Sequence, residues 1–246
     1  MNTSQTIKVL KELRLKGMAS AYEAIVALPV QHQLSLDQAI ARLVEAEQEN
    51  RIAQRTEMYL KASKLRYNTI LEQVECSPQR NLDGAQLARL ADCSFIERAE
   101  NLLITGSTGS GKSYLACALG RQACTKGYKV SYLGMTRLLE KVTQAKLDGT
   151  FVKMLNQLER VNLLILDDFG LQALDSNSRL ALLQILEDRY GKKSVIVTSQ
   201  LPVNTWFGYL AEPTLADAIM DRLTANAQRI ELKGESLRAS KTVKNN

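Results

Sequence analysis

The stretch NLLITGSTGSGKS, from Asn101 to Ser113, decides the fold of this 246-residue chain. Leu102–Thr105 is a short apolar run typical of a buried strand, and it leads directly into a glycine-rich turn. The turn carries the complete pattern G-x-x-x-x-G-K-S, and a helix is expected to begin within it. Between a strand and a helix, this pattern predicts a loop that wraps the phosphates of a nucleoside triphosphate, rather than a plain connecting turn.

Each residue type in this loop has a physical reason. Glycines adopt positive φ and let successive N–H groups approach a phosphate, and the helix start adds unsatisfied N–H groups and its positive dipole end. Lys112 can reach the β- and γ-phosphates, and the Ser113 hydroxyl can ligate Mg²⁺. The predicted nucleotide-binding residues are Gly106, Ser107, Thr108, Gly109, Ser110, Gly111, Lys112, Ser113 and Tyr114.

The composition is that of an ordinary globular protein, with 45% apolar and 24% charged residues. The net charge of +6 favours a polyanionic partner only weakly, because many basic proteins bind no nucleic acid. The four cysteines form no C-x-x-C pair and His32 is the single histidine, which argues against zinc and for reduced thiols of a cytoplasmic protein. Charges near the start and the lack of a long apolar run predict neither a signal peptide nor a membrane span.

Residues 1–66 are predicted to form a small all-helical N-terminal domain for oligomerisation or DNA contact. Met18–Leu28 is a short amphipathic segment, and Ser35 with Gln38 forms a capping-box pattern that starts a long helix to about Ser63. Such helices cannot bury their apolar faces alone. They form a bundle, dock on the next domain, or meet another subunit.

The end of this helical region is rich in basic residues. A solvated helix face and phosphate contacts on nucleic acid both explain such a cluster. Tyr59 and Tyr67 are too isolated to form a stacking platform for single strands, so duplex backbone is the better interpretation if DNA binds here. The predicted DNA contacts in this cluster are Lys61, Lys64 and Arg66.

Residues 67–100 are predicted as a linker with a turn at Ser77–Pro78 and short helical pieces around Ala85–Ala91 and Ser94–Arg98. Such a segment often packs beside a nucleotide base, although its spacing does not prove it. Strands and helices alternate after it. Strands are expected at Lys129–Leu133, Asn162–Leu166, Ser194–Ser199 and Gln228–Leu232, with helices between them. This alternation predicts a parallel, doubly wound α/β sheet in a second domain, 67–246.

Two carboxylates follow the central apolar run Leu163–Leu166. Asp167, at the strand end, is expected to hold Mg²⁺ together with Ser113. Asp168 is expected to orient or deprotonate the attacking water. Alone, such a pair is more often a turn or a helix cap, and the phosphate loop upstream favours the catalytic interpretation.

Two further polar residues are catalytic candidates. Gln200 or Thr198, at the end of the strand Ser194–Ser199, could bond the γ-phosphate or the attacking water, or could simply form a turn. Arg222 could serve the γ-phosphate of a neighbouring subunit, or could make an ordinary surface ion pair.

The motifs together resemble a family. They are, in order, GSTGSGKS at 106–113, LLILDDFG at 163–170, VTSQ at 197–200, Trp206, DRL at 221–223 and GESLR at 234–238. This set is similar to that of the IstB-like ATPases, the transposition helpers related to the helicase loader DnaC in the initiator clade of AAA+ proteins. Leu237 departs from the pattern, which has an aromatic residue there.

The resemblance implies a P-loop NTPase fold of the AAA+ type with sheet order 5-1-4-3-2. It implies ATP and Mg²⁺ as cofactors and a homo-oligomer with ATP at its subunit interfaces. The helical segment Thr136–Arg160 looks like the clade's DNA-tracking insertion. Its predicted phosphate contacts are Arg137, Lys141 and Lys146, for which a solvated face is the open alternative.

The function implied is an ATP-dependent helper that assembles on double-stranded DNA and recruits or stimulates a partner transposase, and that ATP hydrolysis resets. The alternative is a DnaC-type loader of a replicative helicase, which acts on single strands. A free-standing metabolic kinase fits poorly, because no lid or acceptor site is apparent.

Overall fold

The computed structural model describes residues 2–29 and 34–237. His32 and Arg238 lie outside these ranges. The chain divides into two compact units between Met58 and Tyr59, within one long helix. The sequence placed the domain boundary at residue 66, after that helix ends.

The first unit is helical, as the sequence indicates. Its helices are α1 (Thr3–Glu12), α2 (Lys16–Val26) and most of α3 (Leu36–Ser63). The capping box at the start of α3 is confirmed, because the Gln38 backbone N–H donates to Ser35 Oγ at 3.3 Å and the Ser35 N–H donates to Gln38 Oε1 at 3.0 Å.

A buried carboxylate joins α2 to α3. Glu47 Oε2 accepts hydrogen bonds from the backbone N–H of Gly17 (2.9 Å) and Met18 (3.3 Å), the first turn of α2. A Cβ at Gly17 would lie 2.2 Å from the Ala46 carbonyl oxygen, so only glycine allows this close helix contact. The bonds from the backbone and from Arg51 lower the pKa of Glu47, with the Arg51 bond first.

The second unit opens with the segment that the sequence predicts as a linker. It contains η2 (Leu71–Gln73), η3 (Pro78–Arg80), α4 (Gly84–Ala91) and α5 (Ser94–Glu97). Buried Leu82, Leu90 and Phe95 pack it onto the α/β core. The predicted linker is therefore a folded layer of this unit, and we call residues 67–100 the connector.

Five parallel strands form the sheet, in the order β2-β3-β4-β1-β5. Read from the other edge this is 5-1-4-3-2, so the predicted fold is confirmed. The strands are β1 (Asn101–Gly106), β2 (Val130–Gly134), β3 (Leu163–Phe169), β4 (Ser194–Ser199) and β5 (Ala227–Leu232).

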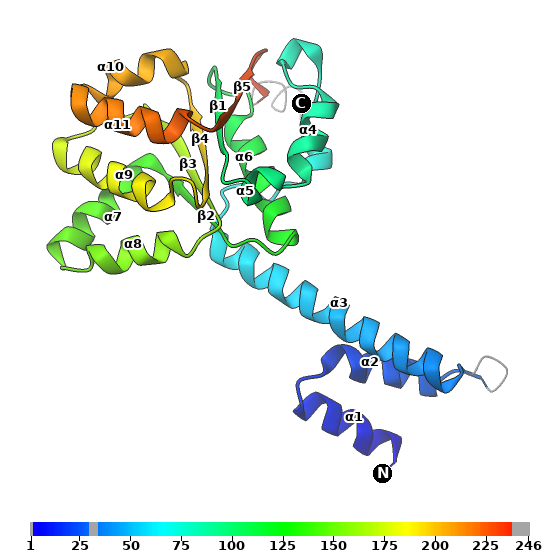
Figure 1. The fold of residues 1–246 in the computed structure, drawn as a ribbon. Helices are drawn as coiled ribbons and strands as arrows, with labels where there is room; N and C mark the ends of the chain where they lie inside the picture. The colour runs from blue at the N-terminus through cyan, green and yellow to red at the C-terminus, as the bar shows by residue number, and fades with distance from the viewer. Residues whose placement is uncertain (1, 30–33, 238–246) are drawn as a thin grey trace, which may run out of the picture. The chain divides into compact units, whose positions relative to one another are not determined.

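Two apolar cores cover the two faces of this sheet, because successive side chains along a strand point to opposite sides. Leu102 and Ile104 of β1 face one core, with helix α6 (Lys112–Thr125) and the connector, and Leu103 faces the other. Figure 1 shows the remaining helices gathered on that second side. They are α7 (Met135–Leu147), α8 (Phe151–Glu159), α9 (Ser176–Arg189), the short η4 (Val203–Thr205), α10 (Trp206–Leu210) and α11 (Pro213–Thr224).

This topology brings the carboxyl ends of β1, β3 and β4 to one edge, where α6 begins. Ligands of open α/β sheets bind at that edge. Among the described residues, no helix has both the length and the apolar content needed to cross a bilayer.

Candidate functional site

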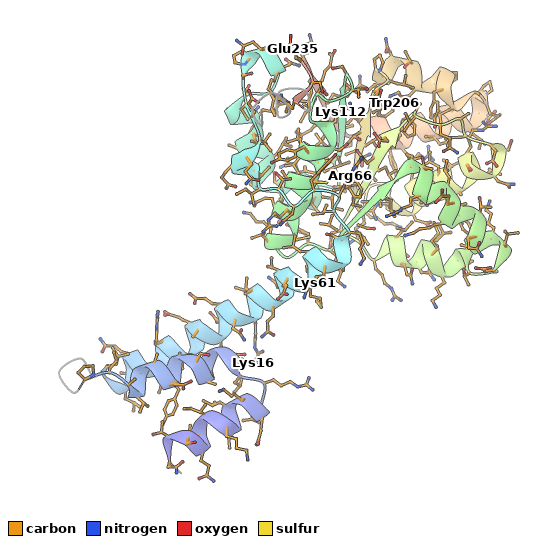
Figure 2. The ribbon with its side chains drawn as sticks, turned by 180° about the vertical axis from the view of Figure 1, so that it is seen from behind. Lys16, Lys61, Arg66, Lys112, Trp206 and Glu235 are labelled. Carbon is orange, nitrogen blue, oxygen red and sulfur yellow. The ribbon has the colours of Figure 1, made fainter. Side chains whose placement is uncertain are left out.

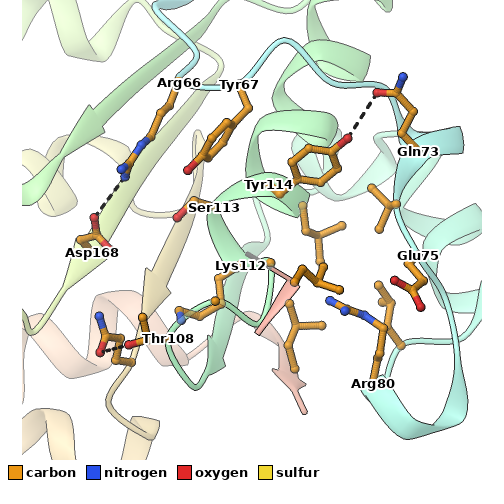
Figure 3. A pocket seen from close by; sticks show the side chains of 18 of the residues that line it. Arg66, Tyr67, Gln73, Glu75, Arg80, Thr108, Lys112, Ser113, Tyr114 and Asp168 are labelled. Carbon is orange, nitrogen blue, oxygen red and sulfur yellow. Dashed lines mark hydrogen bonds and ion pairs between the residues drawn. The ribbon is translucent and has the colours of Figure 1, made fainter. Parts of the chain in front are cut away.

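A cavity of about 770 Å³ opens at the carboxyl edge of the sheet (Figure 3). Its walls come from four parts of the second unit: the loop and helix after β1, the connector, the ends of β3 and β4, and the segment after β5. The residues that line it most directly from these parts are Arg66, Tyr67, Gln73, Val74, Glu75, Arg80, Thr108, Lys112, Ser113, Tyr114, Asp168, Gln200 and Leu237.

The glycines of the loop meet both a conformational and a steric demand. Gly109 has φ +82°, and a Cβ there would lie 2.0 Å from Ser236 Oγ. Gly111 has φ +91°, and a Cβ there would lie 3.0 Å from Arg80 Nη2. The loop therefore needs glycine for two reasons: its backbone adopts positive φ, and two distant segments pack closely against it.

The loop's lysine and serine face the cavity. Lys112 is buried, and its Nζ donates to the carbonyl oxygens of Gly106 and Ser107, both at 2.8 Å. Ser113 Oγ donates to Asp167 Oδ1 at 2.7 Å, which joins the phosphate loop to the acidic strand. This pair of oxygens is where the sequence expects Mg²⁺, and hydroxyl and carboxylate oxygens are the ligands that Mg²⁺ takes.

Asp167 is fully buried at the end of β3 and accepts hydrogen bonds on both carboxylate oxygens. The hydroxyl of Thr198 donates to Oδ1, which Ser113 shares, and the hydroxyl of Tyr132 donates to Oδ2. Burial, and then the bond to Asp167, raise the pKa of Tyr132, so this hydroxyl stays a donor. Thr198 thus orients Asp167 and is not the residue that reaches into the cavity.

Asp168 reaches the cavity because of a bulge. Strand alternation would turn it to the face opposite Asp167. Instead the register between β3 and β4 shifts between Leu166 and Phe169, and Asp168 adopts φ +62°. Its backbone N–H donates to Thr198 Oγ1 at 3.1 Å, which fixes the bulge, and its carboxylate lines the cavity beside Lys112. The conformation is strained for a non-glycine residue, as is common at functional sites.

Gln200 lies just beyond β4 and lines the cavity. Its Oε1 accepts a hydrogen bond from Thr108 Oγ1 at 2.8 Å (Figure 3), so it contacts the phosphate loop itself. Of the two candidates that the sequence leaves open, Gln200 is the one that lines the cavity.

Arg66, which the sequence assigns to DNA, lies at the phosphate end of this cavity (Figures 2 and 3). Its Nη1 is 3.5 Å from both Asp167 Oδ2 and Asp168 Oδ2. The guanidinium also stands over the ring of Tyr67, with its Cζ 5.4 Å from the ring centroid. The bond with Tyr132 is the first cause that raises the pKa of Arg66.

The other end of the cavity is formed by the connector and the last described segment. Val74, Leu82, Leu115 and Leu237 give it an apolar lining, and Tyr114 Oη donates to Gln73 Oε1 at 3.3 Å. An apolar slot with a few polar edges suits a flat ring system such as a nucleobase.

Arg80 stands between the two ends, and Figure 3 shows its guanidinium directed into the cavity. It is only 7% exposed, and its Nη2 donates to the Ser110 carbonyl oxygen at 2.6 Å. Arg80 Nε and the buried Ser110 Oγ have no hydrogen-bond partner among the described residues. Buried polar atoms are rarely left unsatisfied, and a guanidinium without a carboxylate suits an anionic ligand.

The remaining predicted residues lie away from the cavity lining. Arg222, on α11, makes ion pairs with Glu187 Oε2 (2.8 Å) and Asp221 Oδ2 (2.9 Å). Lys61 and Lys64 are exposed near the end of α3. Arg137 and Lys141 are exposed one turn apart on α7, whereas Lys146 Nζ donates to the Asn177 carbonyl oxygen at 3.3 Å.

Sequence reasoning missed Tyr132 and Arg80, and it assigned Arg66 to DNA. Tyr132 left a faint signal, because it is a polar-tipped residue in a buried strand. The sequence suggested that the connector packs beside the base, but it singled out no residue there, since tertiary packing brings these residues to the loop.

Comparisons with known proteins agree with this geometry. The model of the family described as IstB-like ATP binding protein matches residues 8–245. An insertion sequence ATP-binding protein of Sinorhizobium fredii is 42% identical over 233 residues, 95% of each chain. Another, from Pseudomonas fluorescens, is 45% identical over 206 residues, 83% of this chain and 89% of its own.

Solved structures share the fold. The DnaC helicase loader superposes with a TM-score of 0.56 at 20% identity, over 68% of this chain and 98% of its own. The replication initiator DnaA bound to AMPPCP and single-stranded DNA gives 0.57 at 21% identity, over 74% of this chain and 56% of its own. From its phosphate loop, sheet order and family match, the chain belongs to the IstB-like ATP-binding proteins.

Proposed function

We propose that this protein is an ATP-hydrolysing helper of DNA transposition. It assembles on double-stranded DNA, recruits or stimulates a partner transposase, and is reset by ATP hydrolysis. The observation that carries the proposal is the 2.7 Å hydrogen bond between Ser113 and Asp167, because it unites the phosphate loop and the acidic strand in one site. The names of the relatives, which call them insertion sequence ATP-binding proteins, support the link to transposition.

Each site residue has its own role in the proposed hydrolysis. Lys112 binds the β- and γ-phosphates, and Ser113 and Asp167 hold the metal ion. Bound Mg²⁺ supplies charge neutralisation at the phosphates. Asp168 accepts the proton of the attacking water, and Gln200 orients that water. The bulge at Asp168 supports this assignment, since it brings a second carboxylate to the cavity.

Assembly places the nucleotide at a subunit interface, with Arg222 as the residue supplied to the neighbour. In the single chain Arg222 is held by Glu187 and Asp221, so it must exchange these partners when subunits meet. The first unit, residues 1–58, supports assembly as well, because Leu36, Ile40 and Val44 expose an apolar row at a spacing of four on α3.

Duplex DNA is the proposed nucleic acid, and Lys61, Lys64, Arg137 and Lys141 are its proposed phosphate contacts. All four side chains are exposed to solvent. Lys146 is a weaker candidate because its amine already bonds a carbonyl, and Arg66 has a different environment. We place the protein in the cytoplasm, where such DNA transactions occur.

Replacing Asp168 with asparagine tests the enzyme proposal. The variant should still bind ATP, hydrolyse it at least about 100-fold more slowly, and stay assembled on DNA. Phosphate release and sedimentation with duplex DNA measure the two effects. Unchanged turnover would remove Asp168 from the mechanism.

Subunit mixing tests the role of Arg222. Mixed with a Lys112→Ala partner, an Arg222→Ala subunit should restore less hydrolysis than a Glu187→Gln subunit does. Equal restoration by both would return Arg222 to the role of a surface ion pair.

The DnaC-type helicase loader is the competing function, and it rests on the fold likeness alone. Binding to fluorescent duplex and single-stranded DNA with ATP separates the two. A protein that ignored duplex DNA and held a replicative helicase would overturn the transposition proposal.

A further inference from the structure

We propose that Arg66 binds the γ-phosphate of ATP from within the same chain, and so makes the site distinguish ATP from ADP. The inference rests on ATP binding at the cavity described above. It removes Arg66 from the DNA-binding cluster to which its sequence neighbours belong.

The first argument is position. Arg66 lies three residues beyond the end of α3, after Lys64 turns the chain with φ +57°. It lines the same cavity as Lys112, Ser113 and Asp168, and its guanidinium reaches the carboxylates at the ends of the acidic strand. These residues mark the phosphate end of the cavity.

The second argument is the looseness of its present contacts. Both Arg66–carboxylate distances are 3.5 Å, at the outer limit for a hydrogen bond, and both come from the same Nη1. Neither contact is a bidentate pair, which is the strong form of an arginine–carboxylate interaction. The side chain is 46% exposed, so it can turn toward a third anion.

The third argument is charge. Asp167 and Asp168 put two carboxylates next to the place where a terminal phosphate would lie, and like charges at such short range repel. Lys112 bonds the carbonyl oxygens of Gly106 and Ser107 on the loop side. The Arg66 guanidinium lies 3.5 Å from both carboxylates, so a bound γ-phosphate would add a third negative charge close to it.

Two aromatic rings support the Arg66 guanidinium and leave its N–H groups able to bind a ligand. Tyr67 stacks beneath Arg66 and lies 6.0 Å, centroid to centroid, from Tyr114 on the first turn of α6. A cation over an aromatic ring keeps its plane while its N–H groups stay available at the edge. Arg66 is therefore tied to the loop helix and still able to donate.

The experiment measures equilibrium binding in the Asp168→Asn background, where hydrolysis does not consume ATP. Fluorescent analogues of ATP and ADP are titrated, with Mg²⁺, into the parent and into Arg66→Ala, Arg66→Lys and Lys126→Gln. We expect Arg66→Ala to weaken ATP binding about tenfold or more, the size of one charge-assisted hydrogen bond, and ADP binding by less than about twofold.

The controls separate binding from structure. Arg66→Lys should keep much of the ATP preference because it keeps the charge, and Lys126→Gln, at an exposed position at the end of α6, should keep all of it. Thermal melting without nucleotide checks that each variant is folded. Equal losses of affinity for ATP and ADP, or no loss for either, would overturn the inference about Arg66 but not the proposal that the protein binds ATP. A parent that bound no ATP would overturn the proposed function itself.

Discussion

The two ends of the cavity are built in different ways. The phosphate end comes from one continuous stretch, the loop 106–113, joined by Asp167 and Asp168 at the next strand but one in the sheet. The apolar end comes from Gln73–Leu82 and Leu237, which are far apart in the chain and carry no motif for a nucleobase. Local chemistry therefore determines phosphate binding, and tertiary packing determines what surrounds the rest of the ligand.

Removing the central cation of the phosphate end should have the largest effect. Lys112→Ala deletes a buried ammonium from the loop, and we expect the affinity for ATP and ADP to fall about 100-fold or more. Calorimetry measures both. Lys126→Ala, at the exposed end of the same helix, is the matched control and should bind normally. Retained affinity in Lys112→Ala would break the assignment of this end to phosphate.

The contact of Gly109 with the far segment should come next. Gly109→Ala places a Cβ 2.0 Å from Ser236 Oγ and strains a φ of +82°, so we expect nucleotide affinity to fall about 10- to 100-fold. Gly208→Ala, with open space around its Cβ, should have no such effect.

A second substitution divides the two causes at Gly109. In Gly109→Ala/Ser236→Gly the steric clash is relieved and the backbone strain remains. Partial recovery of affinity would show that the far segment shapes the loop. No recovery would mean that the backbone conformation alone demands glycine.

Arg80 joins the two ends and should matter to both nucleotides. Arg80→Met keeps the volume but loses the bond to the Ser110 carbonyl, so we expect ATP and ADP affinities to fall together by about tenfold. Arg89→Met, exposed on α4, is the control. Titration of both nucleotides separates this common loss from the ATP-specific loss expected for Arg66→Ala. A loss of ATP affinity without a loss of ADP affinity would contradict this role of Arg80.

The smallest effect concerns Cys76, a half-buried residue between Glu75 and η3. Burial raises the pKa of Cys76, and it raises those of Cys93, Cys117 and Cys124 to about 11. Thiolate is the form that reacts. Alkylation near pH 8 should therefore label Cys76 first and speed up as pH rises, and ATP should slow it by a few fold.

Mass spectrometry of the labelled protein, with Cys76→Ser as the control, checks this expectation. A labelling rate unaffected by nucleotide would mean that the ligand does not reach the connector.

The sequence predicted a great deal of this molecule. The strand and helix positions and the long helix α3 were foreseen, because alternating apolar runs and a capping box are local signals, and the sheet order followed from the family resemblance. The loop residues could be predicted as a site because one motif spans adjacent residues. The sequence assigned Arg66 to DNA, since a basic residue after a basic helix has no signal that sets it apart from its neighbours.

The sequence by itself determined that a phosphate loop follows one strand and that two carboxylates follow another. Only the tertiary structure decided which residues surround them. Asp168 reaches the cavity through a bulge, Tyr132 and Thr198 meet on Asp167, and Arg66 and Arg80 come from two different segments, the end of the predicted helical region and the predicted linker. The physical reason is the separation of the residues along the sequence. A motif reflects what the backbone requires over a few adjacent residues, whereas these contacts depend on how distant segments pack, which no short pattern encodes.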